Sequence, residues 1–253
     1  MKSKSFAFFL PFFLCISAFA AEDLKAVSCM YEIKSEVYRF ARLRHQISQS
    51  LSPQQAQKVK TQLKASVQEL MLNLHESKPG LDKLKLQAQY QKMDSSISDL
   101  LTESAMASGA TDAMRDKQSK VIALSEEMAA QLIQKIGTPN AKDVALIGTA
   151  KVSIEKLAFD FDECSKDCAK VLPEDLGTIQ KSMDAMRTSL GQYFKKSSYD
   201  MANNQLIFLK KSVSAKTQGT VDGTALDFLI VTTGNLWSLV DEVLDSYVEK
   251  SGG

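Results

Sequence analysis

Arg44 is the first residue whose surroundings suggest binding chemistry. Phe40 and Ile47 lie on the same helical face, at steps of three and four residues. A guanidinium group on a buried face loses its hydration unless an anion or a carboxylate meets it. We therefore expect an anion-binding position at Arg44, assisted by Arg42 and His45. The alternative is a side chain that reaches from the apolar face to water.

Lys151 interrupts an apolar stripe of the second half as Arg44 interrupts the first. It is the weaker ligand-binding candidate, because the flexible stem of a lysine reaches water more readily than a planar guanidinium group.

Cysteines offer a second kind of chemistry. Cys29, Cys164 and Cys168 remain if an N-terminal segment holding Cys15 is removed. In an oxidising compartment, this odd number leaves one thiol over. Cys164 and Cys168 are expected on one helix face, where a bridge between them is strained. Three alternatives stay open: a bridge from Cys29 to either of the others, a local Cys164–Cys168 pair, and unpaired buried thiols.

Acidic residues surround the later cysteines but do not predict a metal site. Two cysteines with acidic neighbours match no familiar zinc spacing, and charges beside an apolar stripe usually form a solvated helix face. The sequence has no Cys-x-x-Cys-His run, no Gly-rich phosphate loop and no Gly-x-Ser-x-Gly motif. We therefore expect no enzyme, no cofactor and no bound metal.

Apolar residues recur at helical spacing along nearly the whole chain, which predicts eight amphipathic helices. Their stripes are represented by Cys29 to Leu51, Ala56 to Leu74, Leu86 to Leu100, Met114 to Ile136, Val144 to Cys168, Leu176 to Leu190, Tyr199 to Val213 and Leu226 to Tyr247.

Helix boundaries are marked by capping and breaking residues. Ser52-Pro53-Gln54-Gln55 predicts a capping box with proline in the first turn, and Gly137 with Pro139 predicts a left-handed cap and a break. Lys78-Pro79-Gly80 predicts a turn. Asn140 and Thr224 are expected N-caps, Pro173 is expected to open a helix, and Ser214 to Gly223 is expected to be the longest loop.

The fold class that follows is all-α, with two consecutive four-helix bundles. We place the first bundle at 21–138 and the second at 139–253. Val37, Phe40, Arg44 and Ile47 align with Val144, Ile147, Lys151 and Ile154, so a diverged duplication is plausible.

The N-terminal 20 residues have the pattern of a secretory signal peptide. Lys2 and Lys4 precede an apolar run from Phe6 to Ala20, and Ala18-Phe19-Ala20 provides small residues for cleavage. The run is shorter than the roughly 20 residues that span a bilayer as a helix, so an uncleaved anchor is the weaker alternative. We expect a soluble periplasmic or secreted protein.

Composition supports a folded chain without a strong charge. Of 253 residues, 44% are hydrophobic, and 31 Lys and Arg oppose 30 Asp and Glu. A near-neutral balance argues against a dedicated nucleic-acid binder. The expected partners are a small anion or an envelope protein, and homodimer formation is left open.

The segment from Phe40 to Leu51 resembles the first-helix motif of the PilJ-like domain, the N-terminal sensor domain of type IV pilus methyl-accepting chemotaxis transducers. That family's motif reads approximately Leu-Ala-Gly-Arg-Gln-Arg-Met-Leu-Ser-Gln-Arg-Met. Ala41, Ser48 and Gln49 match it outright. Gly148 and Lys151 fall on its glycine and second arginine in what looks like a second copy.

The resemblance implies an extracytoplasmic four-helix sensor domain related to nitrate-sensing modules. In those modules an arginine of the motif holds the anion, and His45 occupies that position here. Our first hypothesis is a soluble periplasmic sensory or binding accessory protein for a small anion or a partner helix. The alternative is a non-catalytic structural or interaction protein of the cell envelope.

Overall fold

The computed structural model describes residues 10–49, 52–106, 111–164, 167–193, 196–220 and 223–251, and within these ranges it is all-α. Its elements are α1 (Leu10–Ser48), α2 (Pro53–Lys83), α3 (Gln87–Met106), α4 (Asp112–Ile136), α5 (Pro139–Glu163), α6 (Cys168–Leu190), a short 3-10 helix η1 (Gly191–Tyr193), α7 (Lys196–Thr217) and α8 (Gly223–Ser251).

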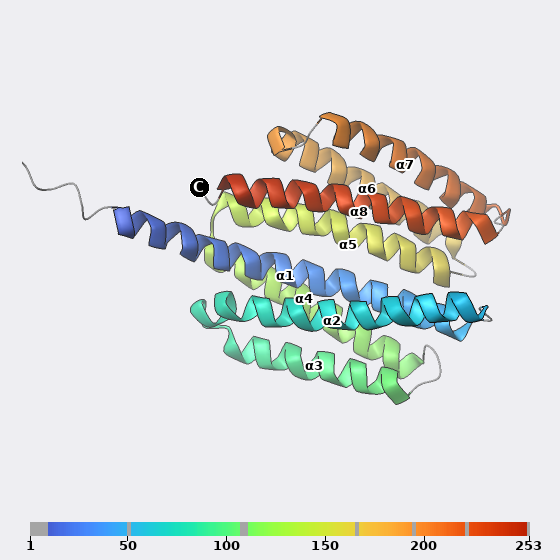
Figure 1. The fold of residues 1–253 in the computed structure, drawn as a ribbon, viewed down its shortest axis with the longest axis horizontal. Coiled ribbons are helices and arrows are strands. Elements are labelled where there is room, and N and C mark those ends of the chain that lie inside the picture. The colour runs from blue at the N-terminus through green and yellow to red at the C-terminus, as the bar shows by residue number, and fades with distance from the viewer. Residues whose placement is uncertain are drawn as a thin grey trace, which may run out of the picture.

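The eight α-helices pack as two sets of four (Figure 1). In the first set, α1 contacts α2 and α4, and α3 closes the ring by contacting both of these helices. In the second, α5 contacts α6 and α8, and α7 contacts both of those. This is the arrangement that the periodicity predicts. That the two sets arose by duplication stays a prediction.

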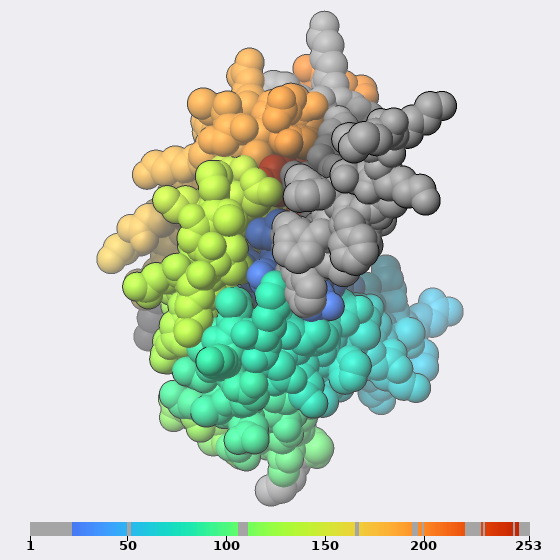
Figure 2. Space-filling view, turned by 90° about the vertical axis from the view of Figure 1, so that its left-hand side faces the viewer, coloured from blue at the N-terminus to red at the C-terminus, as the bar shows by residue number. Residues whose placement is uncertain are grey.

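Helices α1 and α5 join the two sets along an extensive interface. They run in the same direction through the middle of the molecule (Figure 1). Seen end-on, blue atoms of α1 are visible between the α2–α3 end and the α4–α5 connection (Figure 2). A continuous hydrophobic core includes residues of all eight helices, so the two sets share one buried interior.

The predicted stripes supply most of this core. Fully or nearly fully buried members include Ile33, Val37, Leu74, Ile97 and Val121. Leu51 and the side chains of Tyr199 and Leu226 lie outside the described residues. Central packing also buries residues outside the stripes.

Both central helices are buried on several faces. Ala41 and Leu43 of α1, and Val152 and Ala158 of α5, are buried although they lie off the predicted stripes. A helix surrounded by neighbours has no broad solvated face on which its charged side chains can lie. Charged groups in the central parts of α1 and α5, such as Arg42 and Glu155, therefore need partners inside the protein.

Two boundary predictions are confirmed in detail. Ser52 caps α2 in a capping box with Gln55, and Pro53 follows in the first turn. Gly137 ends α4 in the left-handed conformation with φ of 66°, and Pro139 begins α5.

The turn predicted at Lys78-Pro79-Gly80 is wrong, because α2 continues through it to Lys83. A Cβ atom on Gly80 would lie 2.7 Å from both Ala26 Cβ and the Glu22 backbone oxygen. The glycine thus lets α1 approach α2 closely, and the chain turns only at Leu84 to Leu86.

Several other boundaries differ from prediction. Thr138, not Asn140, is the N-cap of α5. Helix α5 ends at Glu163, so Cys164 and Cys168 do not share one helix, and α6 begins at Cys168 with Pro173 inside it. Pro173 is the sixth residue of α6, beyond the first turn, where its missing N–H removes one helical hydrogen bond.

At the C-terminal end, α7 extends to Thr217 and shortens the predicted loop, while α8 begins at Gly223, before Thr224. Residues 1–9 of the predicted signal segment lie outside the described residues, and from Leu10 the backbone is helical and continuous with α1. Signal cleavage stays a prediction. Within the described ranges, none of the helices has an apolar stretch long enough to cross a membrane.

Candidate functional site

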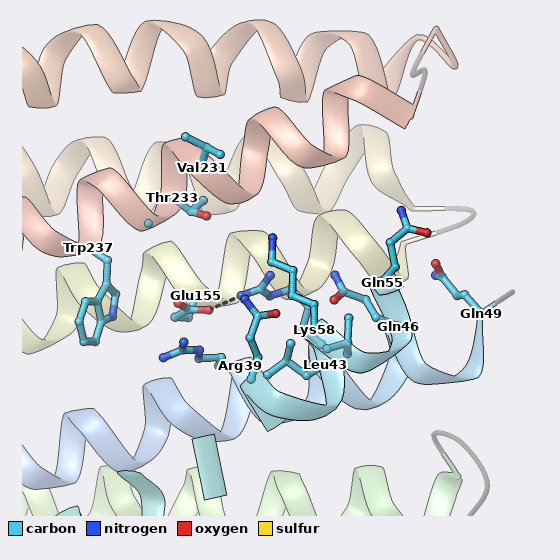
Figure 3. A pocket seen from close by; sticks show the side chains of 14 residues that line it. Arg39, Leu43, Gln46, Gln49, Gln55, Lys58, Glu155, Val231, Thr233 and Trp237 are labelled. Atoms are coloured by element: carbon cyan, nitrogen blue, oxygen red, sulfur yellow. Dashed lines mark hydrogen bonds and ion pairs between the residues drawn. The ribbon is translucent and has the colours of Figure 1, made fainter. Parts of the chain in front are cut away.

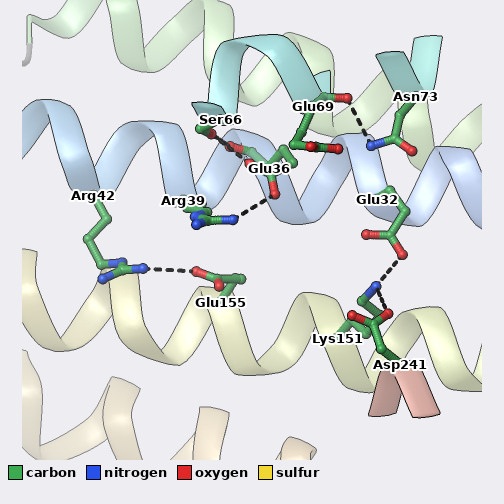
Figure 4. Close-up of polar contacts among 10 residues, drawn as sticks. All are labelled: Glu32, Glu36, Arg39, Arg42, Ser66, Glu69, Asn73, Lys151, Glu155 and Asp241. Carbon is green, nitrogen blue, oxygen red and sulfur yellow. Dashed lines mark hydrogen bonds and ion pairs between the residues drawn. The ribbon is translucent and has the colours of Figure 1, made fainter. Parts of the chain in front are cut away.

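The interface between α1 and α5 is the part of the fold where buried charges gather. At its tightest point, a Cβ atom on Gly148 would lie 2.4 Å from Tyr31 Cγ, so only glycine fits beneath this ring. Further along, acidic and basic side chains of the two helices face one another (Figure 4).

Arg42 and Glu155 form a buried ion pair across this interface. Arg42 Nη2 donates to Glu155 Oε2 at 3.3 Å, and the two side chains are 8% and 11% exposed. Such a pair contributes little net stability, because the cost of desolvating both charges offsets their attraction. Each charge nevertheless compensates for the cost of burying the other.

Lys151 makes a second buried cluster between α1, α5 and α8. Its ammonium group donates to Glu32 and, at 2.5 Å, to Asp241 Oδ1 (Figure 4). It also lies 3.8 Å from the centre of the Trp237 ring, a cation–π contact. Burial raises the pKa of Glu32, although the charge and hydrogen bond of Lys151 oppose this rise.

Between the two sets of helices lies a pocket of about 560 Å³, which we call the interbundle pocket. It is lined by residues of α1, α2, α5 and α8 and by one residue of the loop after α1: Arg39, Arg42, Leu43, Gln46, Gln49, Gln55, Lys58, Val59, Gln62, Glu155, Val231, Thr233, Gly234 and Trp237. Figure 3 shows Trp237 at one end, Gln49 and Gln55 at the other, and Arg39 and Lys58 between them.

The lining combines positive charge with many hydrogen-bonding groups. The lining holds three basic side chains, Arg39, Arg42 and Lys58, and the acidic side chain of Glu155. Its glutamine amides supply both hydrogen-bond donors and acceptors. Two donors in the wall, Arg42 Nε and Trp237 Nε1, are buried without a hydrogen-bond partner among the described residues. Buried donors normally have an acceptor, so this wall is suited to an electron-rich ligand.

Arg39 connects the pocket to a buried carboxylate behind it. Its Nη1 lies 3.2 Å from Glu36 Oε1, and the Ser66 hydroxyl donates to Glu36 Oε2 at 2.6 Å (Figure 4). Glu36 is 4% exposed. Burial raises the pKa of Glu36 to about 7, although Arg39 and the Ser66 hydrogen bond act to lower it.

The four predicted ligand-binding residues do not converge on one point. Arg42 lines the interbundle pocket, and Lys151 adjoins it through Trp237. Arg44 is buried, as its place in the stripe predicts, and this desolvation lowers its pKa, but it is not a lining residue. His45 Nδ1 lies 3.7 Å from Glu163 Oε1, away from the lining.

The cysteine alternatives are resolved in favour of the local pair. Cys164 and Cys168 form a disulfide with a Cα–Cα distance of 5.3 Å, and Cys29 is a buried free thiol whose pKa is raised to about 12 by burial. The alternative of a bridge from Cys29 is therefore not the one found. The pair avoids the strain of a single helix face because Cys164 follows α5 and Cys168 begins α6.

Two of the acidic residues near this disulfide, Asp160 and Asp175, share one lysine. Lys156 Nζ donates to Asp160 at 2.5 Å and to Asp175 at 2.6 Å. Burial acts to lower the pKa of Lys156, but the two hydrogen bonds and the negative charges of Asp160 and Asp175 together raise it. Among the described residues, no group of three or more His, Cys, Asp or Glu side chains could hold a metal ion.

Sequence inspection missed most of the pocket. Arg39, Lys58 and the glutamines lie on solvated-looking faces of their own helices, and Trp237 is nearly 200 residues from Arg39 along the chain. They are brought together because α5 packs against both α1 and α8, which places α8 across the pocket from α1 and α2. The single tryptophan was the one signal that could have drawn attention to α8.

Comparison with known proteins adds no relative: no family model, curated protein or solved structure matches this chain. The likeness to the PilJ-like domain stays a prediction.

Proposed function

We propose that this chain is a non-catalytic binding or sensory accessory protein that holds a small organic anion in the interbundle pocket. The observation that carries the proposal is the set of three basic side chains in the lining, which is opposed by Glu155 in the lining and by Glu36 behind it, so that positive charge remains in excess. Buried or half-buried positive charge attracts an anion more strongly than the same charge does in open water.

The remaining lining residues favour an organic anion over a bare inorganic one. A pocket of about 560 Å³ lies within the range of roughly 300–1,000 Å³ typical of small-molecule sites. Leu43, Val59, Val231 and Trp237 offer apolar surface beside the basic groups. A carboxylate on a flat or apolar body would match both kinds of surface.

The pocket's position supports a sensory role. Its walls come from α1 and α2 of one set and from α5 and α8 of the other, so a bound ligand would contact both. A ligand that binds one relative placement of the sets better than another shifts the population toward it. The extracytoplasmic location rests on the signal-like N-terminus, and the link to pilus chemotaxis sensors rests on the Phe40–Leu51 motif.

A thermal-shift screen of the purified protein tests the proposal. Benzoate, malonate, citrate, phosphate and nitrate would be compared at constant ionic strength. A ligand at about 100 times its dissociation constant stabilises by about 2.7 kcal/mol, which for a chain of this size raises the melting temperature by about 5–10 °C.

Lys58→Glu and Lys60→Glu form a matched pair of variants for this screen. Both lysines are exposed on α2, but only Lys58 lines the pocket. The ligand-induced shift should shrink in Lys58→Glu and persist in Lys60→Glu. If no anion stabilises the wild type, the alternative of a structural or interaction protein of the envelope is favoured instead.

A further inference from the structure

Arg39 belongs to two ionic environments at once. It lines the interbundle pocket with a side chain that is 31% exposed, and the same guanidinium group bonds the nearly inaccessible carboxylate of Glu36. A ligand anion that binds Arg39 therefore competes with Glu36 for its positive charge.

The other groups around Glu36 could not take the place of the positive charge of Arg39. From α2, the Ser66 hydroxyl donates a hydrogen bond, and Glu69, the next acidic residue of that helix, is exposed. From α5, Glu155 acts on Glu36 as a like charge. The buried residues of α4, which also packs on α1, are all uncharged.

We infer that the interbundle pocket takes up its organic anion together with one proton, which comes from solvent and is held by the Glu36 carboxyl group. The inference rests on the proposed function. An anion at Arg39 adds negative charge near Glu36 and draws the guanidinium toward the ligand. Both changes disfavour a buried carboxylate, and protonation removes the penalty.

The consequence is pH-dependent affinity with a defined sign. The pKa of Glu36 in the free protein is about 7, and the bound anion raises it further. Below that pH, Glu36 is already protonated and the dissociation constant is constant. Above it, and up to the higher pKa that Glu36 has in the complex, binding recruits a proton and the dissociation constant rises by up to about tenfold per pH unit.

Titration calorimetry with benzoate tests this inference, because benzoate stays ionised from about pH 6 to about pH 9. At a pH near 8, the binding heat would be measured in triethanolamine and in Tris, two cationic buffers whose protonation enthalpies differ. The difference gives the number of protons taken up. We expect a substantial fraction of one proton in the wild type and none in Glu36→Gln, with uptake retained in Glu69→Gln.

The possible results of the calorimetry separate the proton-uptake inference from the proposed function. Benzoate binding with no proton uptake in the wild type overturns the inference and leaves the proposed function standing. Uptake that persists in Glu36→Gln overturns the assignment to Glu36 and directs attention to another acid, such as Asp175, whose pKa is also raised to about 7 by burial. Absence of binding at every pH overturns both statements.

Discussion

Arg42 and Glu155 show how single residues sustain the charged interface between α1 and α5. Arg42→Leu should destabilise the protein by about 3 kcal/mol or more, because it leaves Glu155 buried without its cation. The double variant Arg42→Leu/Glu155→Leu should lose much less, since no charge is stranded. Urea unfolding of the two single variants and the double variant measures the coupling. Additive losses would show that the pair does not act as a unit.

Glu36 should make the protein less stable as pH rises through the neutral range. Its pKa is raised from 4.5 to about 7, so the folded state binds a proton more tightly than the unfolded state does. Stability from this group is full below about pH 4.5 and is lost as pH rises to about 7, by at most about 3 kcal/mol.

Chemical denaturation of wild type and Glu36→Gln across this range checks the sign. The variant should lose less stability than the wild type between pH 5 and pH 7.5, since glutamine does not titrate. Parallel curves for the two proteins would mean that Glu36 does not titrate in this window.

Residue-level prediction succeeded where the signal was local to one helix. The spacing of Arg44 to Phe40 and Ile47 places it on the buried face of α1, where the structure has it, while the anion-binding role stays a prediction. The partner of Arg42 could not be predicted, because Glu155 is brought to it by the packing of α5 on α1 and by nothing in the neighbouring sequence.

At the scale of the element, the close approach of α1 and α5 depends on Gly148. Gly148→Ala should destabilise by about 1–3 kcal/mol, because the new methyl group would overlap the Tyr31 ring and its Cβ. Gly177→Ala on α6 is the control: no atom lies within 4 Å of its added Cβ, and alanine favours a helix by up to about 1 kcal/mol. Equal effects in thermal unfolding would argue against this contact.

The disulfide between Cys164 and Cys168 fixes the junction of α5 and α6. It closes a very short loop, so the chain-entropy model gives about 2 kcal/mol and a shift of about 4–8 °C in melting temperature. Cys164→Ser/Cys168→Ser should melt lower by this amount and keep its helical circular dichroism. Peptide mapping should find these two cysteines joined and Cys29 unmodified. A bridged Cys29 would contradict the structure.

Helix boundaries were predictable where the determinant is local. The capping box at Ser52 and the left-handed Gly137 need only their neighbours. Pro79-Gly80 suggested a turn, but Gly80 instead allows α1 to pack closely, because a larger residue there would clash with Ala26. Local turn propensity carries no information about such a long-range contact.

For the whole molecule, one shared core predicts one cooperative transition. The hydrophobic core runs through both helix sets, and α1 and α5 would each expose buried surface if the sets separated. Thermal unfolding followed by calorimetry and by tryptophan fluorescence should therefore coincide. Two resolved transitions would instead support two independent domains with a boundary near residue 138.

The central claim is that the interbundle pocket binds an organic anion, and the emission of Trp237 tests it most directly. This side chain is the only tryptophan in the chain, and it lines the pocket. Benzoate would be titrated at constant ionic strength, with N-acetyltryptophanamide as the blank. We predict a saturable change in emission, with the dissociation constant at least about tenfold weaker in Lys58→Glu and unchanged in Lys60→Glu. An emission that does not respond to benzoate, or that responds equally in both variants, would contradict the claim.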